Sequence, residues 1–132
     1  MAKKTVQATI RQQKYKTEIQ AKNHILIADE PIEVAGQDFG FTPTELLEAS
    51  LASCTAMTIR MYADRKGWDL TEAKINVSFK RNISTHLVTF KKDIELFGNL
   101  NDKQRLRLKE IGTKCPIEKI LKGQVDVESR LF

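Results

Sequence analysis

A charge-free run at residues 49–59 is the feature that most constrains how this chain folds. It lies inside a segment that opens with a capping box, in which Thr42 is the N-cap, Pro43 the first helical residue and Glu45 the third. Gly67, which follows a pair of basic residues, is a typical helix stop. The sequence therefore predicts one long helix between Thr42 and Gly67 whose central part carries no charge.

The central part of this helix lacks the charged face that a surface helix normally shows. Several of its side chains are also small enough for another segment to approach closely: Ala49, Ser50, Ala52, Ser53 and Ala56. Each sheet in a chain of 132 residues supplies mainly one apolar face, so we expect a second copy to cover the rest, in an intertwined homodimer. The alternative is a helix enclosed by the chain's own curved sheet.

Strand patterns occur before and after the long helix. Alternating or β-rich stretches predict strands at residues 5–10, 15–21, 25–29, 73–81, 86–98 and 124–132. A second helix is predicted to begin near Asn101 and to be interrupted at Gly112, and a short helix follows and ends at Gly123. The order of elements favours an α+β fold with antiparallel sheet, in a single domain of residues 1–132.

Two cysteines are the candidate reactive groups. At 100° per residue, the helix face of Cys54 also carries Leu51, Met57 and Met61, which together would form an apolar pocket for an alkyl group. The alternative is that Cys54 fills the core as a small hydrophobic residue. Cys115 falls at the N-cap of the last helix, where Ser, Thr, Asp or Asn is usual, and this is the setting of a reactive thiol.

Composition and charge argue against several other classes of protein. The net charge is +5, but the lysines are scattered among acidic residues and form no basic block with interleaved aromatics, which disfavours nucleic-acid binding. No apolar stretch approaches the roughly 20 residues that cross a membrane, and the first residues do not resemble a signal peptide, so we expect a soluble, cytoplasmic protein. Two cysteines and two histidines without ligand spacing predict neither a metal site nor a cofactor, and no role is assigned to either histidine.

Two stretches resemble the OsmC/Ohr superfamily of thiol-dependent hydroperoxide reductases: "GFTPTELLEASLASCTAMTIRMYADRKGW" around Cys54 and "KCPIEKIL" around Cys115. The resemblance implies an OsmC-like fold, with antiparallel sheets wrapped around a long central helix in a homodimer with active sites at the subunit interface. It also implies that Cys54 is the peroxidatic thiol, that Cys115 is the resolving thiol, and that a dithiol reduces the disulfide formed between them. The expected substrate is an organic hydroperoxide, bound by Leu51, Met57 and Met61.

The sequence departs from the superfamily pattern at two positions. The peroxidase branches carry a glutamate directly after the helix-opening proline, whereas here Thr44 follows Pro43 and Glu45 comes next. They also place an arginine near the first hairpin, where Lys14 aligns best among Arg11, Lys14 and Lys16. Lysine cannot reproduce the planar, two-pronged contact of arginine. Glu45 and Lys14 are therefore the remaining catalytic candidates, and an OsmC-fold dimer that binds an apolar ligand or handles sulfur without efficient turnover is the alternative function.

Glu45 has a second possible role in the helix cap. Nine residues separate it from Cys54, which at 1.5 Å per residue is roughly 13 Å along a straight helix, on the opposite face. A catalytic part for Glu45 would therefore have to be played across the dimer or by orienting a basic residue.

Overall fold

The computed structural model describes residues 5–132, in two compact units that divide between Leu47 and Glu48. The first unit contains β1 (Gln7–Ile10), β2 (Thr17–Ala21), β3 (His24–Ala28) and a short 3-10 helix, η1 (Ile32–Val34). The long helix α1 (Pro43–Lys66) begins in this unit and continues into the second. The second unit also contains β4 (Asp69–Arg81), β5 (Val88–Asn99), α2 (Asp102–Gly112) and α3 (Pro116–Lys122).

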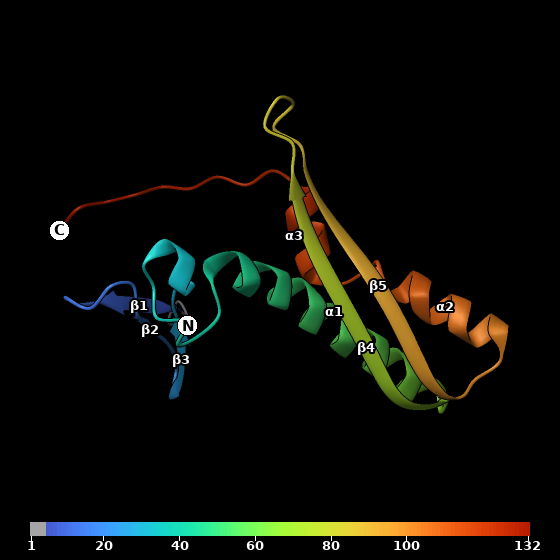
Figure 1. The fold of residues 1–132 in the computed structure, drawn as a ribbon. Helices are drawn as coiled ribbons and strands as arrows, with labels where there is room; N and C mark the ends of the chain where they lie inside the picture. Colours follow the sequence, from blue (N-terminus) through green and yellow to red (C-terminus); the bar gives the residue numbers. More distant parts are fainter. Residues whose placement is uncertain (1–4) are drawn as a thin grey trace. The chain divides into compact units, whose positions relative to one another are not determined.

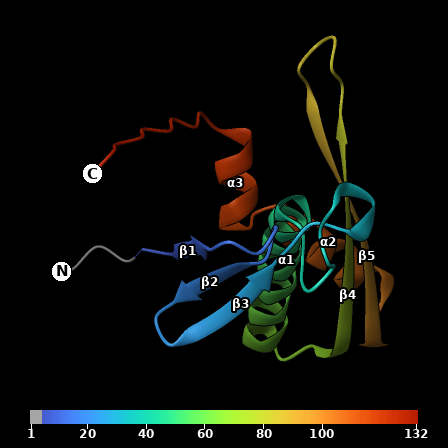
Figure 2. The same ribbon diagram turned by 60° about the vertical axis from the view of Figure 1, so that its left-hand side comes forward.

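The three strands of the first unit form an antiparallel sheet in the order β1-β2-β3 (Figure 2). Ile10 lies opposite Thr17 in the first pair of strands, and Thr17 lies opposite Ala28 in the second. The three predicted strands are confirmed, with β1 and β2 each beginning two residues later than predicted and β3 shifted by one residue toward the N-terminus.

A buried carboxylate organises the loop that follows β3. Asp29 is 2% exposed and accepts backbone N–H groups from Glu30 at 2.7 Å, Phe39 at 3.2 Å, Gln37 at 3.3 Å and Tyr15 at 3.4 Å. Burial alone would raise the pKa of Asp29, but these donors hold it below its ordinary value because they stabilise the charged form. One ionised side chain thus fixes the backbone leading into α1.

The ends of α1 are as the sequence predicts. The N–H of Thr42 donates to the Glu45 carboxylate at 2.9 Å, and the N–H of Glu45 donates to the Thr42 hydroxyl at 3.2 Å, which is a capping box. Gly67 has a φ of 68°, the left-handed conformation that favours glycine after a helix. The local sequence at both ends therefore specifies this helix.

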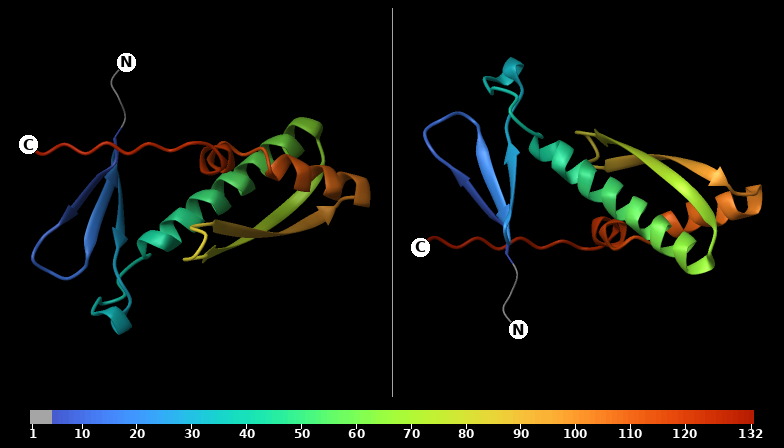
Figure 3. Two further views of the ribbon diagram at one scale, coloured as in Figure 1. Left: turned by 90° about the horizontal axis from the view of Figure 1, so that it is seen from above. Right: turned by 90° about the horizontal axis from the view of Figure 1, so that it is seen from below.

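In the second unit, α1 lies along one face of the β4–β5 hairpin (Figure 1 and Figure 3). The hairpin is antiparallel and pairs Ile75 with Ile94. The hydrophobic core of the second unit lies between α1, the hairpin and α2. Its buried residues are Ile59, Ala63, Leu70, Leu100 and Leu108. The α+β class with antiparallel sheets is confirmed.

One face of α1 is buried within the second unit. The buried residues recur every four positions, at Leu51, Thr55, Ile59 and Ala63. Met57 and Met61 lie on another face and are 59% and 67% exposed. Within the second unit, the hairpin and α2 thus cover a single side of α1.

The C-terminal segment corrects one expectation. A strand is predicted at residues 124–132, but the structure gives this stretch no regular secondary structure, and Val125 and Val127 are 68% and 81% exposed (Figure 1). An alternating pattern describes which side chains could share a face, yet a strand also needs a neighbouring edge that pairs with its backbone.

Within residues 5–132, no helix is long and apolar enough to cross a membrane.

Candidate active site around two cysteines

Cys115 occupies the N-cap of α3 and is completely buried. Its backbone is extended, with φ −68° and ψ 144°, and its Sγ accepts the N–H of Glu118 at 3.3 Å. Pro116 follows in the first turn of the helix, a position that favours proline. The thiol therefore takes the position that a serine or aspartate side chain usually fills.

A glycine allows the end of α2 to approach α1 closely. A Cβ at Gly112 would lie 3.2 Å from Cδ1 of Ile59 and 3.3 Å from Cγ2 of Thr55, closer than side chains normally pack. The chain then has only a short connection before Cys115. Close packing at Gly112 thus brings the N-cap of α3 against the middle of α1.

The residue next to Cys54 makes the contact between the two cysteine-bearing segments. Thr55 is completely buried, and its Oγ1 lies 3.7 Å from Sγ of Cys115. Cys54 itself is half-buried on α1, one position before Thr55, and both thiols are free. Cys115 therefore lies against the turn of α1 that carries Cys54.

A buried lysine completes this arrangement. Nζ of Lys92, on β5, donates to a Glu118 carboxylate oxygen at 2.6 Å, to the Gly112 carbonyl at 2.9 Å and to Thr55 Oγ1 at 3.1 Å. Its side chain is only 12% exposed. One ammonium group thus joins β5, α1, the end of α2 and α3.

Glu118, in the first turn of α3, forms ion pairs with two lysines. Its two carboxylate oxygens bind Lys92 at 2.6 Å and Lys122 at 2.8 Å. Burial by itself raises the pKa of Glu118, but the hydrogen bonds from Lys122 and Lys92 hold it below its ordinary value. The carboxylate is therefore ionised at neutral pH.

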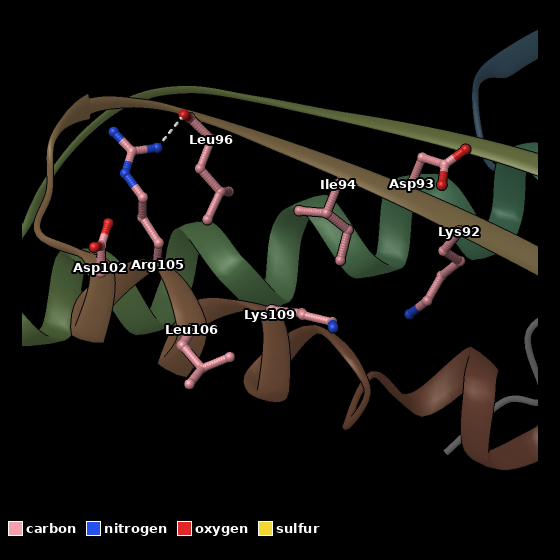
Figure 4. A pocket seen from close by; sticks show the side chains of 8 residues that line it. All are labelled: Lys92, Asp93, Ile94, Leu96, Asp102, Arg105, Leu106 and Lys109. Atoms are coloured by element: carbon pink, nitrogen blue, oxygen red, sulfur yellow. Dashed lines mark hydrogen bonds between the residues drawn. The ribbon is translucent and has the colours of Figure 1, made fainter.

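A groove of about 570 Å³ lies between β5 and α2 (Figure 4). Lys92 stands at one end and Arg105 at the other, and the lining is completed by Asp93, Ile94, Leu96, Asp102, Leu106 and Lys109. Arg105 donates to the backbone carbonyls of Leu96, Gly98 and Leu100, and so fastens α2 to the end of β5. Neither cysteine lines this groove.

The predicted substrate-binding residues fall on different surfaces of α1. Leu51 is 2% exposed and belongs to the buried face, whereas Met57 and Met61 are exposed. Met57 also lines an open hollow of about 400 Å³ between α1 and β4. Of these three residues, only the methionines are accessible within the single chain.

Glu45 and Lys14 belong to the first unit. The Glu45 carboxylate accepts the N–H of Thr42 in the helix cap. Lys14 is exposed in the bend between β1 and β2, and Arg11, the arginine nearest to it in the sequence, pairs with Glu18 at 3.4 Å.

Sequence reasoning missed Lys92 and the part played by Thr55. A signal for Lys92 was present, because the inward positions of β5 otherwise carry apolar residues or glycine: Phe90, Ile94, Leu96 and Gly98. A lysine in that row is a charge facing the core, and such charges are normally paired. Thr55 gave no comparable signal.

Comparisons with known proteins agree with this architecture. One solved structure, from Psychrobacter arcticus 273-4 and named for osmotic stress induction and a detoxification response, is 25% identical, with a TM-score of 0.77 over 91% of this chain and 89% of that one. An OsmC like protein from Mycoplasma pneumoniae is 18% identical, with a TM-score of 0.77 over 92% and 89%. The organic hydroperoxide resistance protein OhrB of Bacillus subtilis is 20% identical, with a TM-score of 0.64 over 96% of each chain.

A search of curated proteins returns no match. The sequence model of the OsmC-like protein family matches residues 35–130, a range that includes α1, the β4–β5 hairpin and both cysteines. With the fold and most of its length in agreement, this chain belongs to the OsmC-like family.

Proposed function

We propose that the protein is a cysteine-based hydroperoxide reductase in which Cys54 is the peroxidatic thiol and Cys115 the resolving thiol. The observation that carries this proposal is the contact of the buried Cys115 sulfur with Thr55, the residue next to Cys54. Two free thiols on neighbouring segments are the arrangement that a peroxide-driven disulfide requires. The family and the names of several relatives support the same chemistry.

The reaction has two oxidative steps. The Cys54 thiolate attacks one peroxide oxygen, the O–O bond breaks, and an alcohol leaves while Cys54 becomes a sulfenic acid. The Cys115 sulfur then attacks the Cys54 sulfur, a disulfide forms and water leaves. A dithiol returns both cysteines to thiols and becomes a disulfide itself.

A homodimer would supply the apolar wall of the site. Met57 and Met61 are exposed beside Cys54 on α1, and flexible thioether side chains suit a pocket for alkyl groups of varied shape. A second copy over this face would shield the methionines from water and enclose the hydroperoxide. Reduced thiols persist in the cytoplasm, which is where we expect the protein to act.

Peroxide treatment followed by mass spectrometry tests the proposal. Cumene hydroperoxide should convert the wild-type protein to a form in which one peptide pair is joined through Cys54 and Cys115. Cys54→Ser should consume peroxide only at the background rate. Cys115→Ser should stop at a Cys54 sulfenic acid, which dimedone traps. If both thiols stay reduced and Cys54→Ser consumes peroxide like the wild type, the proposal is wrong.

A second candidate is an OsmC-fold dimer that binds an apolar ligand or handles sulfur without turnover. Two observations favour it: the Glu45 carboxylate is bonded within the helix cap, and Arg11 is paired with Glu18. This candidate predicts that excess hydroperoxide leaves both cysteines reduced. Rapid disulfide formation with efficient reduction by a dithiol would exclude it.

A further inference from the structure

The hydroxyl of Thr55 is held in one orientation by its neighbours. A helical threonine often donates to the carbonyl four residues earlier, as Thr58 does to Cys54 at 2.8 Å. Thr55 instead accepts a hydrogen bond from the Lys92 ammonium at 3.1 Å and has Cys115 Sγ as its acceptor at 3.7 Å. Because an ammonium group only donates, the hydroxyl proton is left to point at the sulfur.

Lys92 is itself fixed in place. Its three N–H groups are used by the Glu118 carboxylate, the Gly112 carbonyl and Thr55. Lys92 and Glu118 are both about nine-tenths buried, so water screens this pair weakly. Lys122 is the other charged partner of Glu118 and is mostly exposed. The result is a rigid chain from ammonium to hydroxyl to sulfur.

We propose that Lys92 and Thr55 are positioning residues for the reduction of the Cys54–Cys115 disulfide, because they stabilise Cys115 as the leaving thiolate. This inference rests on the proposed function, and it names the side chains that assist the step in which a dithiol reduces the disulfide. Cys54 is half-buried and Cys115 is completely buried, so an external dithiol reaches the Cys54 sulfur.

The step balances in atoms and electrons. A thiolate of the dithiol attacks Cys54 Sγ, the Cys54–Cys115 bond breaks, and its electron pair stays on Cys115 Sγ. The second thiol of the reductant then displaces the Cys54 sulfur from the mixed disulfide, and both cysteines take up protons. The charge that develops on Cys115 meets the Thr55 hydroxyl and the N–H of Glu118. A stabilised leaving thiolate speeds the exchange, and the same two hydrogen bonds to the reduced Cys115 sulfur favour the reduced form at equilibrium.

Separate measurement of the reduction step tests this role. The disulfide is formed with diamide, a thiol oxidant, so that the experiment does not depend on peroxide chemistry. Reduction by dithiothreitol is then followed for its rate and its equilibrium constant. A hydrogen bond contributes about a fivefold effect. Thr55→Val should therefore lower both the rate and the equilibrium constant about fivefold. Since a tenfold change in the equilibrium constant corresponds to about 29.6 mV, the midpoint potential of the Cys54–Cys115 disulfide should become about 20 mV more negative.

Matched variants separate this role from a purely structural one. Thr55→Ser keeps the hydroxyl and should stay within about twofold of the wild type. Lys92→Met should slow reduction about tenfold, because it removes the charge that orients Thr55. Lys91→Met, which removes an equal charge from the neighbouring exposed position, should have no effect beyond about twofold.

Each remaining outcome identifies what failed. If Thr55→Val and Lys92→Met are folded and their disulfides are reduced like the wild type, this inference is wrong and the proposed function stands. If diamide forms the disulfide but hydroperoxide does not, the proposed function fails while the reduction experiment still tests the inference. If diamide forms no Cys54–Cys115 disulfide, both are overturned.

Discussion

Neutralising Glu118 tests how much its buried ion pair with Lys92 contributes to the stability of the fold. The change is Glu118→Gln, which keeps the shape of the side chain and removes its charge. Breaking a buried ion pair outright costs about 3–5 kcal/mol. The Gln carbonyl still accepts a hydrogen bond, and Lys92 keeps Thr55 and the Gly112 carbonyl, so a smaller loss is expected.

The expected loss in the free energy of unfolding is about 2 kcal/mol at neutral pH, nearly all of it from the pair with Lys92. The pair with Lys122 adds little, because the Lys122 side chain is 74% exposed. A matched control is Glu72→Gln, since Glu72 and Lys74 are 3.8 Å apart with both side chains more than half exposed. That variant should lose at most about 0.5 kcal/mol.

The effect should depend on pH in a defined direction. The pKa of Glu118 in the folded protein lies below its ordinary value of 4.5, so its charge stabilises the fold above that value. The contribution is lost as the pH falls through the folded pKa, because the wild-type carboxyl then becomes neutral like the Gln side chain. The difference between variant and wild type should shrink accordingly.

Urea unfolding at one protein concentration, from about pH 7 down to about pH 3, measures this difference. Convergence of the two proteins at low pH is the expected result. A difference that is the same at every pH would show that the loss comes from packing, and the electrostatic reasoning would then be refuted. An equal loss in Glu72→Gln would refute the assignment to burial.

Two further predictions concern the two units separately. Leu108→Ala should lower the free energy of unfolding by about 3 kcal/mol, because the side chain is completely buried in the core of the second unit. The control Leu106→Ala, at a position 58% exposed, should lower it by at most about 1 kcal/mol. Urea titration of both variants and the wild type measures these losses. Asp29→Asn should increase hydrogen exchange in the loop after β3 at neutral pH, because the loop loses an ionised acceptor of four N–H groups. This effect should be present above the ordinary pKa of 3.8 and fade as the pH falls through the lower pKa of the folded state. Asp38→Asn, at an exposed position in the same loop, should exchange like the wild type, and equal effects of the two changes would contradict the role given to Asp29.

Local signals explain why the helices could be predicted from the sequence. The capping box at Thr42 and Glu45, the stop at Gly67 and the cap at Asn101 each depend on residues a few positions apart. The predicted strand at residues 124–132 failed for the opposite reason. A strand requires a neighbouring edge, and sequence alternation does not specify one.

The candidate site was predictable only in part. Both cysteines stand out in the sequence, and the N-cap position of Cys115 follows from the proline after it. The groups around the sulfur come together through long-range packing, because Lys92 is 37 residues from Thr55 and 20 from Gly112. No local pattern links such distant positions, although a lysine on the inner face of β5 could have been recognised as needing a partner.

The inward lysine of β5 also has a consequence for folding fidelity. The β4–β5 hairpin is long and its inner row is otherwise apolar, so a slip of two residues would keep the hydrophobic pattern nearly intact. Such a slip would replace Lys92 opposite Glu118 with Phe90 or Ile94 and leave a buried carboxylate facing an aromatic or aliphatic side chain. A hairpin in the wrong register therefore has a higher electrostatic free energy, which hydrophobic packing alone would not produce. The ammonium group of Lys92 thus helps to specify the register of β5 during folding.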